Sequence, residues 1–422
     1  MAGPQAEPDA GYGPVRFGPG LPGDGLAVPP EAAAALAGAA AEGRAEPLGG
    51  GPALLDAVRG FAARRGLTAG PDRLVAAPGA PALLLALTAA VGGEVLLPRP
   101  CCAWWAPGAR LLGRAVYPVP TPVECGGVPD PYALLETVRR VRAEGGDPRL
   151  LVLSVADDPT ATVPPPEVLH ETVEAAAGAG LHIVSDETLR DTRHPAAAPG
   201  PATGGKPRPT VAVSPAEMVP DQVTVLSDLS GALLPPGWPA AFAVLPPTAD
   251  GHRLRGRVLD ALTALGGRIG APVAAAAAYA LAEPPAVTGR VAATARLHGT
   301  LAAAAYRLLR RAGVLLLPPQ AGRHLYADLG PLRPALAARG IGDAQDLEDH
   351  LGARLGMPAP GGHRFGDHLS ELRVRLPTWP LAGATEEQRG ATLTAPDPLE
   401  LPPVRAALSM FAAVFDDLGA AR

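Results

Sequence analysis

The chain has 422 residues, of which 47% are hydrophobic and 18% are charged, a composition that supports a large buried core and excludes a disordered protein. Its 36 Lys and Arg residues against 41 Asp and Glu residues give a formal net charge of −5, which disfavours a protein that binds nucleic acid by neutralising phosphates. Three cysteines, no signal-like start and no strongly apolar stretch of about 18 residues predict a cytoplasmic protein without a membrane partner.

The predicted elements begin after a Gly- and Pro-rich stretch, residues 1–27, which we expect to form a flexible arm. Helices are predicted over residues 30–42 and 52–65, the second from apolar residues at helical spacing behind a proline. Strand-like runs then alternate with helical runs, a pattern that predicts a parallel sheet. The predicted strands are 74–77, 95–97, 115–119, 150–155, 182–185, 223–226 and 242–245, and the helices between them begin near residues 81, 104, 131 and 167.

The second half of the chain begins with a long helical pattern, from about residue 252 to residue 311, and short strands return from Gly313 onward. We therefore predict an α/β fold: a large domain with a mostly parallel sheet and helices on both faces, and a smaller C-terminal α/β domain. The predicted divisions are the arm 1–27, a segment 28–50 that joins the small domain, the large domain 51–290 and the small domain 291–422.

Short catalytic signatures are uninformative in this sequence. A literal GxGxxG over residues 18–23 contains Pro19 and Pro22 and follows no strand, so it does not predict a dinucleotide site. The motifs of zinc proteases, serine hydrolases, P-loop nucleotide hydrolases and dithiol oxidoreductases do not occur. No metal site is predicted, because the histidines are scattered and the cysteines lack zinc spacing.

A series of weaker signals follows the predicted strands in a fixed order. The series consists of Gly79-Ala80, LLPRP over 96–100, LSVADDPTAT over 153–162, IVSDETLRD over 183–191, LSDLSGALLPPGWPAAFAV over 226–244 and LRVRL over 372–376. Together these segments resemble the class I and II aminotransferases, which are fold type I enzymes that use pyridoxal phosphate. The resemblance covers roughly residues 45–415 and implies the fold type I architecture.

The resemblance fails at the catalytic lysine. The family pattern, roughly LSSFSKAFGLPGLRIGYAV, aligns with residues 226–244 without a gap and places the Schiff-base lysine on Gly231. Glycine has no amine to bond the cofactor aldehyde or to move the substrate proton, so the resemblance implies that both roles are lost. The one lysine of the chain, Lys206, lies in a Gly- and Pro-rich loop, where it either reaches the cleft or is simply solvated.

The phosphate-binding positions of the family are also changed. By the resemblance, the serine that binds the phosphate corresponds to Asp228 and the arginine to Pro239, while Gly79 and Ala80 match the turn beside it. The serine hydroxyl that donates to the phosphate is thus replaced by a carboxylate, and the arginine cation is lost. Both changes disfavour binding of the dianionic phosphate. We therefore expect no bound cofactor, although pyridoxal phosphate is the cofactor of the family.

Around the cofactor ring, the asparagine of the family corresponds to Asp158 and the tyrosine to Leu189. Asp186 keeps the identity of the aspartate that holds the pyridine nitrogen protonated, or it could simply cap a loop.

Cys102 falls at the position of the stacking aromatic residue, two residues before Trp104. A reactive thiol needs a base or a cation beside it, so a buried and inert thiol is favoured.

Arg375 is the best match to the arginine that clamps the substrate carboxylate, with Arg373 as a competing match and a surface strand arginine as the alternative. The acidic residues Asp158, Asp186 and Asp228 favour a cationic ligand, whereas Arg375 suits a carboxylate. We therefore expect a small amine or an amino-acid-like ligand.

Three functions follow from these observations. The one we expect is a pseudoenzyme that does not transaminate and has a binding or regulatory role in a biosynthetic pathway. The alternatives are an enzyme with cofactor-free chemistry in the remodelled cleft, and an atypical pyridoxal-phosphate-dependent aminotransferase that uses Lys206 and acts on an amino acid or amine. The resemblance also implies a homodimer, with the arm 1–27 reaching across to the partner.

Overall fold

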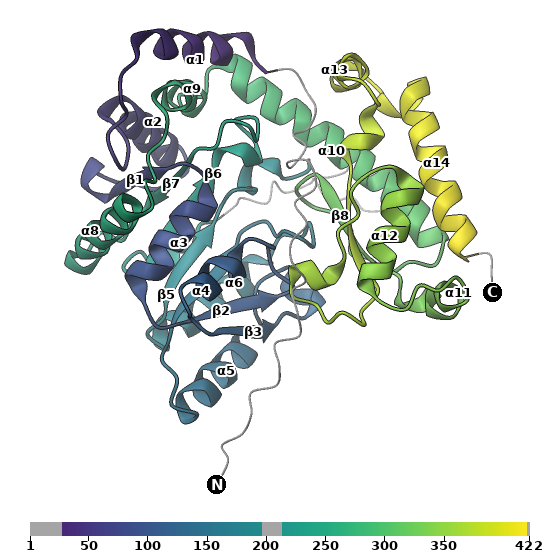
Figure 1. Ribbon diagram of the computed structural model, residues 1–422, viewed down its shortest axis with the longest axis horizontal. Coiled ribbons are helices and arrows are strands. Elements are labelled where there is room, and N and C mark those ends of the chain that lie inside the picture. The colour runs from purple at the N-terminus through teal and green to yellow at the C-terminus, as the bar shows by residue number, and fades with distance from the viewer. Residues whose placement is uncertain (1–27, 196–212, 420–422) are drawn as a thin grey trace, which may run out of the picture.

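The computed structural model describes residues 28–195 and 213–419 (Figure 1). The predicted arm 1–27 and Lys206 lie outside these residues. The predicted α/β fold is confirmed, because a large helix-covered sheet and a smaller second sheet account for the described chain. Among the described residues, no helix has both the length and the apolar character needed to cross a membrane.

The large domain is built on a seven-stranded sheet of order β1-β7-β6-β5-β4-β2-β3. All neighbouring strands are parallel except β7, which runs antiparallel to β6 and to β1. Continuous apolar runs such as LLVL over 150–153 are typical of strands covered on both faces, and these residues are fully buried. The strands are β1 Leu74–Ala77, β2 Glu94–Arg99, β3 Val116–Pro120, β4 Pro148–Ser154, β5 His182–Asp186, β6 Val223–Asp228 and β7 Ala241–Val244.

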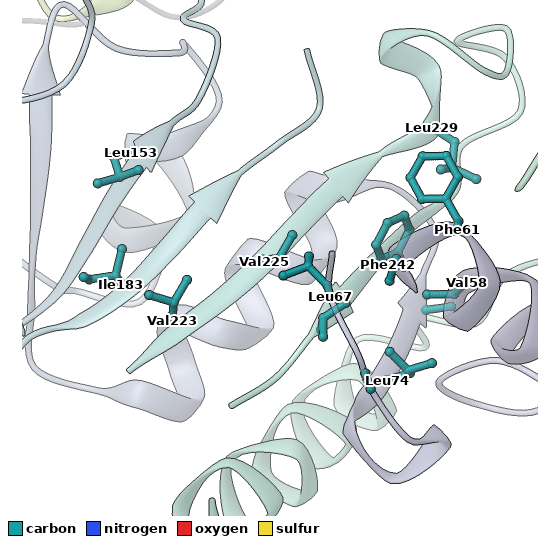
Figure 2. Packing of buried hydrophobic residues seen from close by; sticks show 14 of the residues in the cluster. Val58, Phe61, Leu67, Leu74, Leu153, Ile183, Val223, Val225, Leu229 and Phe242 are labelled. Atoms are coloured by element: carbon teal, nitrogen blue, oxygen red, sulfur yellow. The ribbon is translucent and has the colours of Figure 1, made fainter. Parts of the chain in front are cut away.

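Helices cover both faces of this sheet. One face packs against α2 (Pro52–Ala63), α5 (Pro131–Ala143), α6 (Pro166–Gly178) and α9 (Ala271–Leu281). Figure 2 shows part of this core, where Phe61 of α2 packs edge-on against Phe242 of β7 with ring centres 5.8 Å apart. The opposite face packs against α3 (Ala80–Val91), α4 (Trp105–Leu111) and α8 (Ala249–Ala264). The result is three layers, with the short α7 (Pro215–Met218) leading into β6.

The first described helix, α1 (Pro30–Glu42), packs against α9 of the large domain, and its Leu36 contacts the core there (Figure 1). This placement differs from the expectation that segment 28–50 joins the small domain. Both helices are rich in alanine, so their backbones can approach closely. Gly49, at the end of the segment, also bridges to Ala76 of β1.

The smaller domain holds an antiparallel pair of strands, β8 (His324–Asp328) and β9 (Arg373–Pro377), within a cluster of helices. The helix α10 (Pro285–Arg311) runs without interruption through the predicted boundary at residue 290 and supplies Leu297, Leu301 and Leu309 to the small-domain core. In Figure 1 it leads from the large domain to the small one. The remaining helices are α11 Arg333–Ala337, α12 Ala344–Leu355, α13 Glu386–Thr394 and α14 Pro402–Gly419.

Candidate functional site

The residues selected from the sequence gather at the carboxyl edge of the sheet. Asp186 ends β5, Asp228 ends β6, and Asp158 follows β4 by four residues. Since β4, β5 and β6 are parallel neighbours, their carboxyl ends lie together, which is where open α/β sheets bind ligands. Among the described residues, no group of three or more His, Cys, Asp and Glu could hold a metal ion.

Asp228 caps the first turn of α3. Its Oδ2 accepts a hydrogen bond from the backbone amide of Ala80 at 2.6 Å, and its Oδ1 accepts from the amide of Ser230 at 2.8 Å. A Cβ atom on Gly79 would lie 3.6 Å from Oδ2 of Asp228 and 3.7 Å from Cβ of Pro239, so these four predicted positions do come together. Helix amino termini attract anions, and here the Asp228 carboxylate occupies that position.

Asp186 is 6% exposed and accepts two hydrogen bonds from neutral donors. Oδ1 accepts from the amide of Thr188 at 2.9 Å, and Oδ2 accepts from the indole Nε1 of Trp105 at 3.2 Å. Asp186 therefore does cap its loop. Burial raises the pKa of Asp186 to about 6, and the nearby Asp228 adds to the rise.

The contact from Trp105 to Asp186 was not predicted from the sequence. The available signal was its place three residues after Cys102, at the start of α4. Leu189, aligned with the family tyrosine, is half-buried and its carbonyl accepts a hydrogen bond from Oγ1 of Thr192 at 2.7 Å.

Gly231 lies in a short 3-10 turn, Leu229–Gly231, directly after β6. A Cβ atom at this position would lie 2.4 Å from the carbonyl oxygen of Thr188 and 2.7 Å from its Cγ2. Side-chain carbons do not approach backbone atoms that closely, so any larger residue requires the loop at Thr188 to move. The position aligned with the family lysine therefore lacks an amine and also lacks the space for a side chain.

The two candidate arginines share one face of β9 and have different partners. Nη1 of Arg375 lies 2.6 Å from Oδ1 and 2.8 Å from Oδ2 of Asp158, across the two domains. Arg373 instead pairs within the small domain, with Asp328, Asp367 and Glu371. Arg375 is thus the arginine that reaches the carboxyl edge of the large-domain sheet. Burial raises the pKa of Asp158, but the charges of Arg375 and His324 and the hydrogen bonds from Arg375 and Cys102 together outweigh burial, and the resulting pKa is below the ordinary value.

The ion pair corrects one expectation from the sequence. Asp158, Asp186 and Asp228 were expected to form a negatively charged corner, but the charge of Asp158 is balanced by Arg375.

Cys102 is 6% exposed, and its thiol donates to Oδ2 of Asp158 at 3.4 Å. Burial and the charges of Asp158 and Asp186 raise the pKa of Cys102 well above its usual value. On the other side of Asp158, Nε2 of His324 lies 3.6 Å from Oδ1, and burial lowers the pKa of His324 to about 4. The carboxylate thus separates the thiol from the imidazole, an order that does not activate a cysteine nucleophile.

A hollow of about 430 Å³, a volume that includes open solvent, lies beside Asp228 and is lined by Phe61, Phe242 and Thr188 among others. Four of its charged side chains form two ion pairs, Arg65 with Asp191 at 2.6 Å and Arg190 with Glu187 at 2.6 Å.

A sequence profile described as aminotransferase class I and II matches residues 20–354. The chain belongs to this family. One curated relative, the probable aspartate/prephenate aminotransferase of Thermus aquaticus, is 28% identical over 204 residues, or 47% of this chain and 48% of the relative. The match thus spans about half the length of that protein.

Solved structures of aminotransferases share the fold along nearly the whole chain. A mutant of Thermus thermophilus aspartate aminotransferase has a TM-score of 0.72 at 21% identity and covers 93% of this chain and 94% of its own. The N-succinyldiaminopimelate aminotransferase of Mycobacterium tuberculosis has a TM-score of 0.70 at 22% identity, covering 92% and 90%. The aromatic aminotransferase of Pyrococcus horikoshii has a TM-score of 0.71 at 18% identity, covering 94% of both chains.

Family membership overturns the expectation that the chain has no cofactor. That expectation was wrong, because the chain belongs to a family of pyridoxal-phosphate enzymes, and pyridoxal phosphate is the cofactor that membership implies. The residues fit this group in part. Asp186 offers a carboxylate for the ring nitrogen. Gly231 has no amine and no space for a side chain, so this position does not fit covalent attachment of the cofactor. The carboxylate of Asp228 caps the helix terminus that would face the phosphate, so this corner does not fit phosphate binding as the family performs it.

Proposed function

We propose that this member of the aminotransferase class I and II family does not carry out lysine-dependent transamination and has a binding or regulatory role in a biosynthetic pathway. The observation that carries the proposal is Gly231. The residue has no amine, and the carbonyl of Thr188 would lie 2.4 Å from an added Cβ atom. The proposal concerns the missing amine, and pyridoxal phosphate stays the cofactor implied by the family.

The ligand that we propose for the cleft is a small amine or an amino-acid-like molecule. Asp186 supports this class, because its carboxylate accepts from the neutral donors Trp105 and Thr188 and can still attract a cation. Trp104, which is partly exposed and packs edge-on against Trp105 with ring centres 6.3 Å apart, adds an aromatic ring that can stabilise a cation.

The family itself favours a second candidate, an active pyridoxal-phosphate-dependent aminotransferase. The curated relative and the structural neighbours carry aminotransferase names. The amine would have to come from Lys206, the one lysine in the chain. A lysine at position 206 would act from outside the position that the family uses.

Because the chain has a single lysine, one experiment can distinguish the two candidate functions. The purified full-length chain is incubated with pyridoxal phosphate, 2-oxoglutarate and a panel of acidic, aromatic and aliphatic amino acids, and keto-acid formation is followed. A second sample is reduced with borohydride, and modified peptides are located by mass spectrometry. Lys206→Arg serves as the matched control, because it removes the only side-chain amine and keeps the charge.

We expect no keto-acid formation by either protein and no reduced adduct on Lys206. Turnover that disappears in Lys206→Arg, together with a reduced adduct on Lys206, would establish the second candidate instead.

We further propose that the chain is a cytoplasmic homodimer, since two-fold assembly is the family pattern and symmetric dimers are the commonest oligomers. Sedimentation velocity at micromolar concentration tests the assembly, with a dimer expected. A monomer under these conditions contradicts this proposal.

A further inference from the structure

The cleft arginine already has a carboxylate partner. Both oxygens of Asp158 accept from Nη1 of Arg375, at 2.6 and 2.8 Å, and the Arg375 guanidinium carbon lies 4.9 Å from the centre of the Phe365 ring. The side chains of Arg375 and Asp158 are 22% and 21% exposed. The pair is therefore partly exposed to solvent.

The loop that carries Asp158 is fixed on both sides. The amide of Asp157 donates to the carbonyl of Thr162 at 2.8 Å, and the amide of Ala161 donates to the carbonyl of Asp157 at 3.0 Å. The carbonyl of Ala161 in turn accepts from the amide of Gln320 at 2.7 Å, in the segment that leads to β8. A ligand carboxylate that bound Arg375 would have to displace this docked loop or leave Asp158 beside it without a cation. Leaving a partly buried charge unpaired opposes such binding.

The other arginine on the same face offers no replacement. Arg373 contacts three carboxylates, those of Asp328, Asp367 and Glu371. By contrast, Asp186 accepts from two neutral donors, and among the described residues no cation contacts it. The site therefore combines a cation, Arg375, whose charge is already balanced, with a carboxylate, Asp186, that no described cation balances.

We infer that Asp158 excludes ligand carboxylates from Arg375, so that the cleft takes an amine or another organic cation that lacks an α-carboxylate. In this arrangement Asp158 is a specificity-determining residue, and its carboxylate stands where the carboxylate of an amino acid would bind. The inference rests on the proposed function, because it narrows the ligand class of the same site.

The experiment uses two probes that differ only by the carboxylate, 4-fluorophenethylamine and 4-fluorophenylalanine. The two probes share the aromatic ring and the amine, so a difference in their binding reports on the carboxylate alone. Binding to the full-length chain is measured by fluorine NMR line broadening and titration. The variants are Asp158→Asn, which keeps the shape and removes the charge, Asp158→Ser as a smaller neutral replacement, and the double variant Asp158→Asn with Arg375→Gln. Near-ultraviolet circular dichroism verifies that each variant is folded.

We expect the unmodified chain to bind the amine at least tenfold more tightly than the amino acid. Asp158→Asn and Asp158→Ser should each raise affinity for the amino acid at least tenfold, and the double variant should lose that gain. Equal binding of both probes by the unmodified chain, or folded Asp158 variants with no gain for the amino acid, would overturn the inference.

Failure of the proposed function has a different signature. If the unmodified chain binds neither probe, the proposed amine site is wrong. A gain for the amino acid in Asp158→Asn that the double variant abolishes would still establish that Asp158 keeps carboxylates from Arg375.

Discussion

Asp228 and Ala80 lie 148 residues apart in the chain, and the carboxylate of Asp228 accepts the backbone amide of Ala80 at 2.6 Å. The hydrogen bond ties the end of β6 to the start of α3, a helix whose own N-cap residue, Gly79, has no side chain to accept the free amides. A residue distant in sequence thus performs the role that an adjacent Ser, Thr, Asn or Asp performs in most helices.

Replacing Asp228 with alanine should loosen the first turn of α3. We expect a loss of about 1–2 kcal/mol, the usual range for a lost cap. Asp228→Asn keeps an acceptor oxygen and should lose less. Hydrogen exchange followed by mass spectrometry provides the local measurement, since amides near Ala80 should exchange faster in Asp228→Ala. Asp130→Ala is the matched control, because Asp130 caps α5 through the amide of Ala133. Faster exchange of both helices in either variant would contradict a local cap.

The Arg375–Asp158 pair should show a measurable coupling energy. Breaking a buried ion pair costs roughly 3–5 kcal/mol, and partial exposure of this pair reduces the expected cost of Arg375→Gln to about 2–3 kcal/mol. In a double-mutant cycle with Asp158→Asn, the coupling should be at least about 1 kcal/mol. The control cycle uses Arg59 and Asp56, whose side chains are 52% and 59% exposed, and should give under about 0.5 kcal/mol. Equal coupling energies in the two cycles would show that the Arg375–Asp158 pair stabilises the protein no more than an exposed ion pair does.

The close contacts around Gly231 predict the cost of adding a side chain at this position. Gly231→Ala should destabilise the protein by about 1–3 kcal/mol, as overpacking does, because the new Cβ atom meets the carbonyl of Thr188. Gly237→Ala is the control six residues later, since a Cβ atom there meets nothing within 4 Å. Its effect should stay within about 0.5 kcal/mol. Urea unfolding midpoints measure the stability of the two variants. Similar midpoints would mean that a side chain fits at position 231.

The same geometry bears on restoring the lysine. Gly231→Lys should be at least as destabilising as Gly231→Ala, and it should not create transaminase activity, because the chain around Thr188 has to move first. Rapid transamination by Gly231→Lys would show that the chain around Thr188 moves at little cost in free energy.

Much of the large domain could be predicted from local sequence. The apolar runs of β1 and β5 coincide with the predicted strands, and the family resemblance aligned Asp186 and Asp228 with positions of one site, where the parallel strands β5 and β6 end side by side. The pairing of Arg375 with Asp158 could not be predicted, since it joins residues 217 apart through the packing of two domains. The packing of α1 against α9 could not be predicted for a related reason: an alanine-rich face is compatible with many partners, and only the folded chain selects α9.

Asp157 provides a test of buried charge by pH. Burial raises its pKa to about 7, against an ordinary value near 3.8, although Thr160 donates to its Oδ2 from both the amide and the hydroxyl. Between these two pH values the folded state holds a proton that the unfolded state has lost. The contribution of Asp157 is therefore most favourable at low pH and declines as the pH rises from about 4 to about 7.

Asp157→Asn should remove this decline, because asparagine does not ionise. Relative to the unmodified chain, the variant should gain about 2–4 kcal/mol of stability between pH 4 and pH 8, from three units at 1.36 kcal/mol each as an upper value. Half-buried His182 and buried His324, whose pKa values fall to about 4, act in the opposite direction over part of this window, so the informative quantity is the difference between variant and unmodified chain. Asp221→Asn, an exposed site, controls for the loss of one carboxylate. Urea unfolding at each pH supplies the values, and a difference that stays flat from pH 4 to pH 8 would mean that Asp157 ionises in the folded protein as freely as an exposed aspartate.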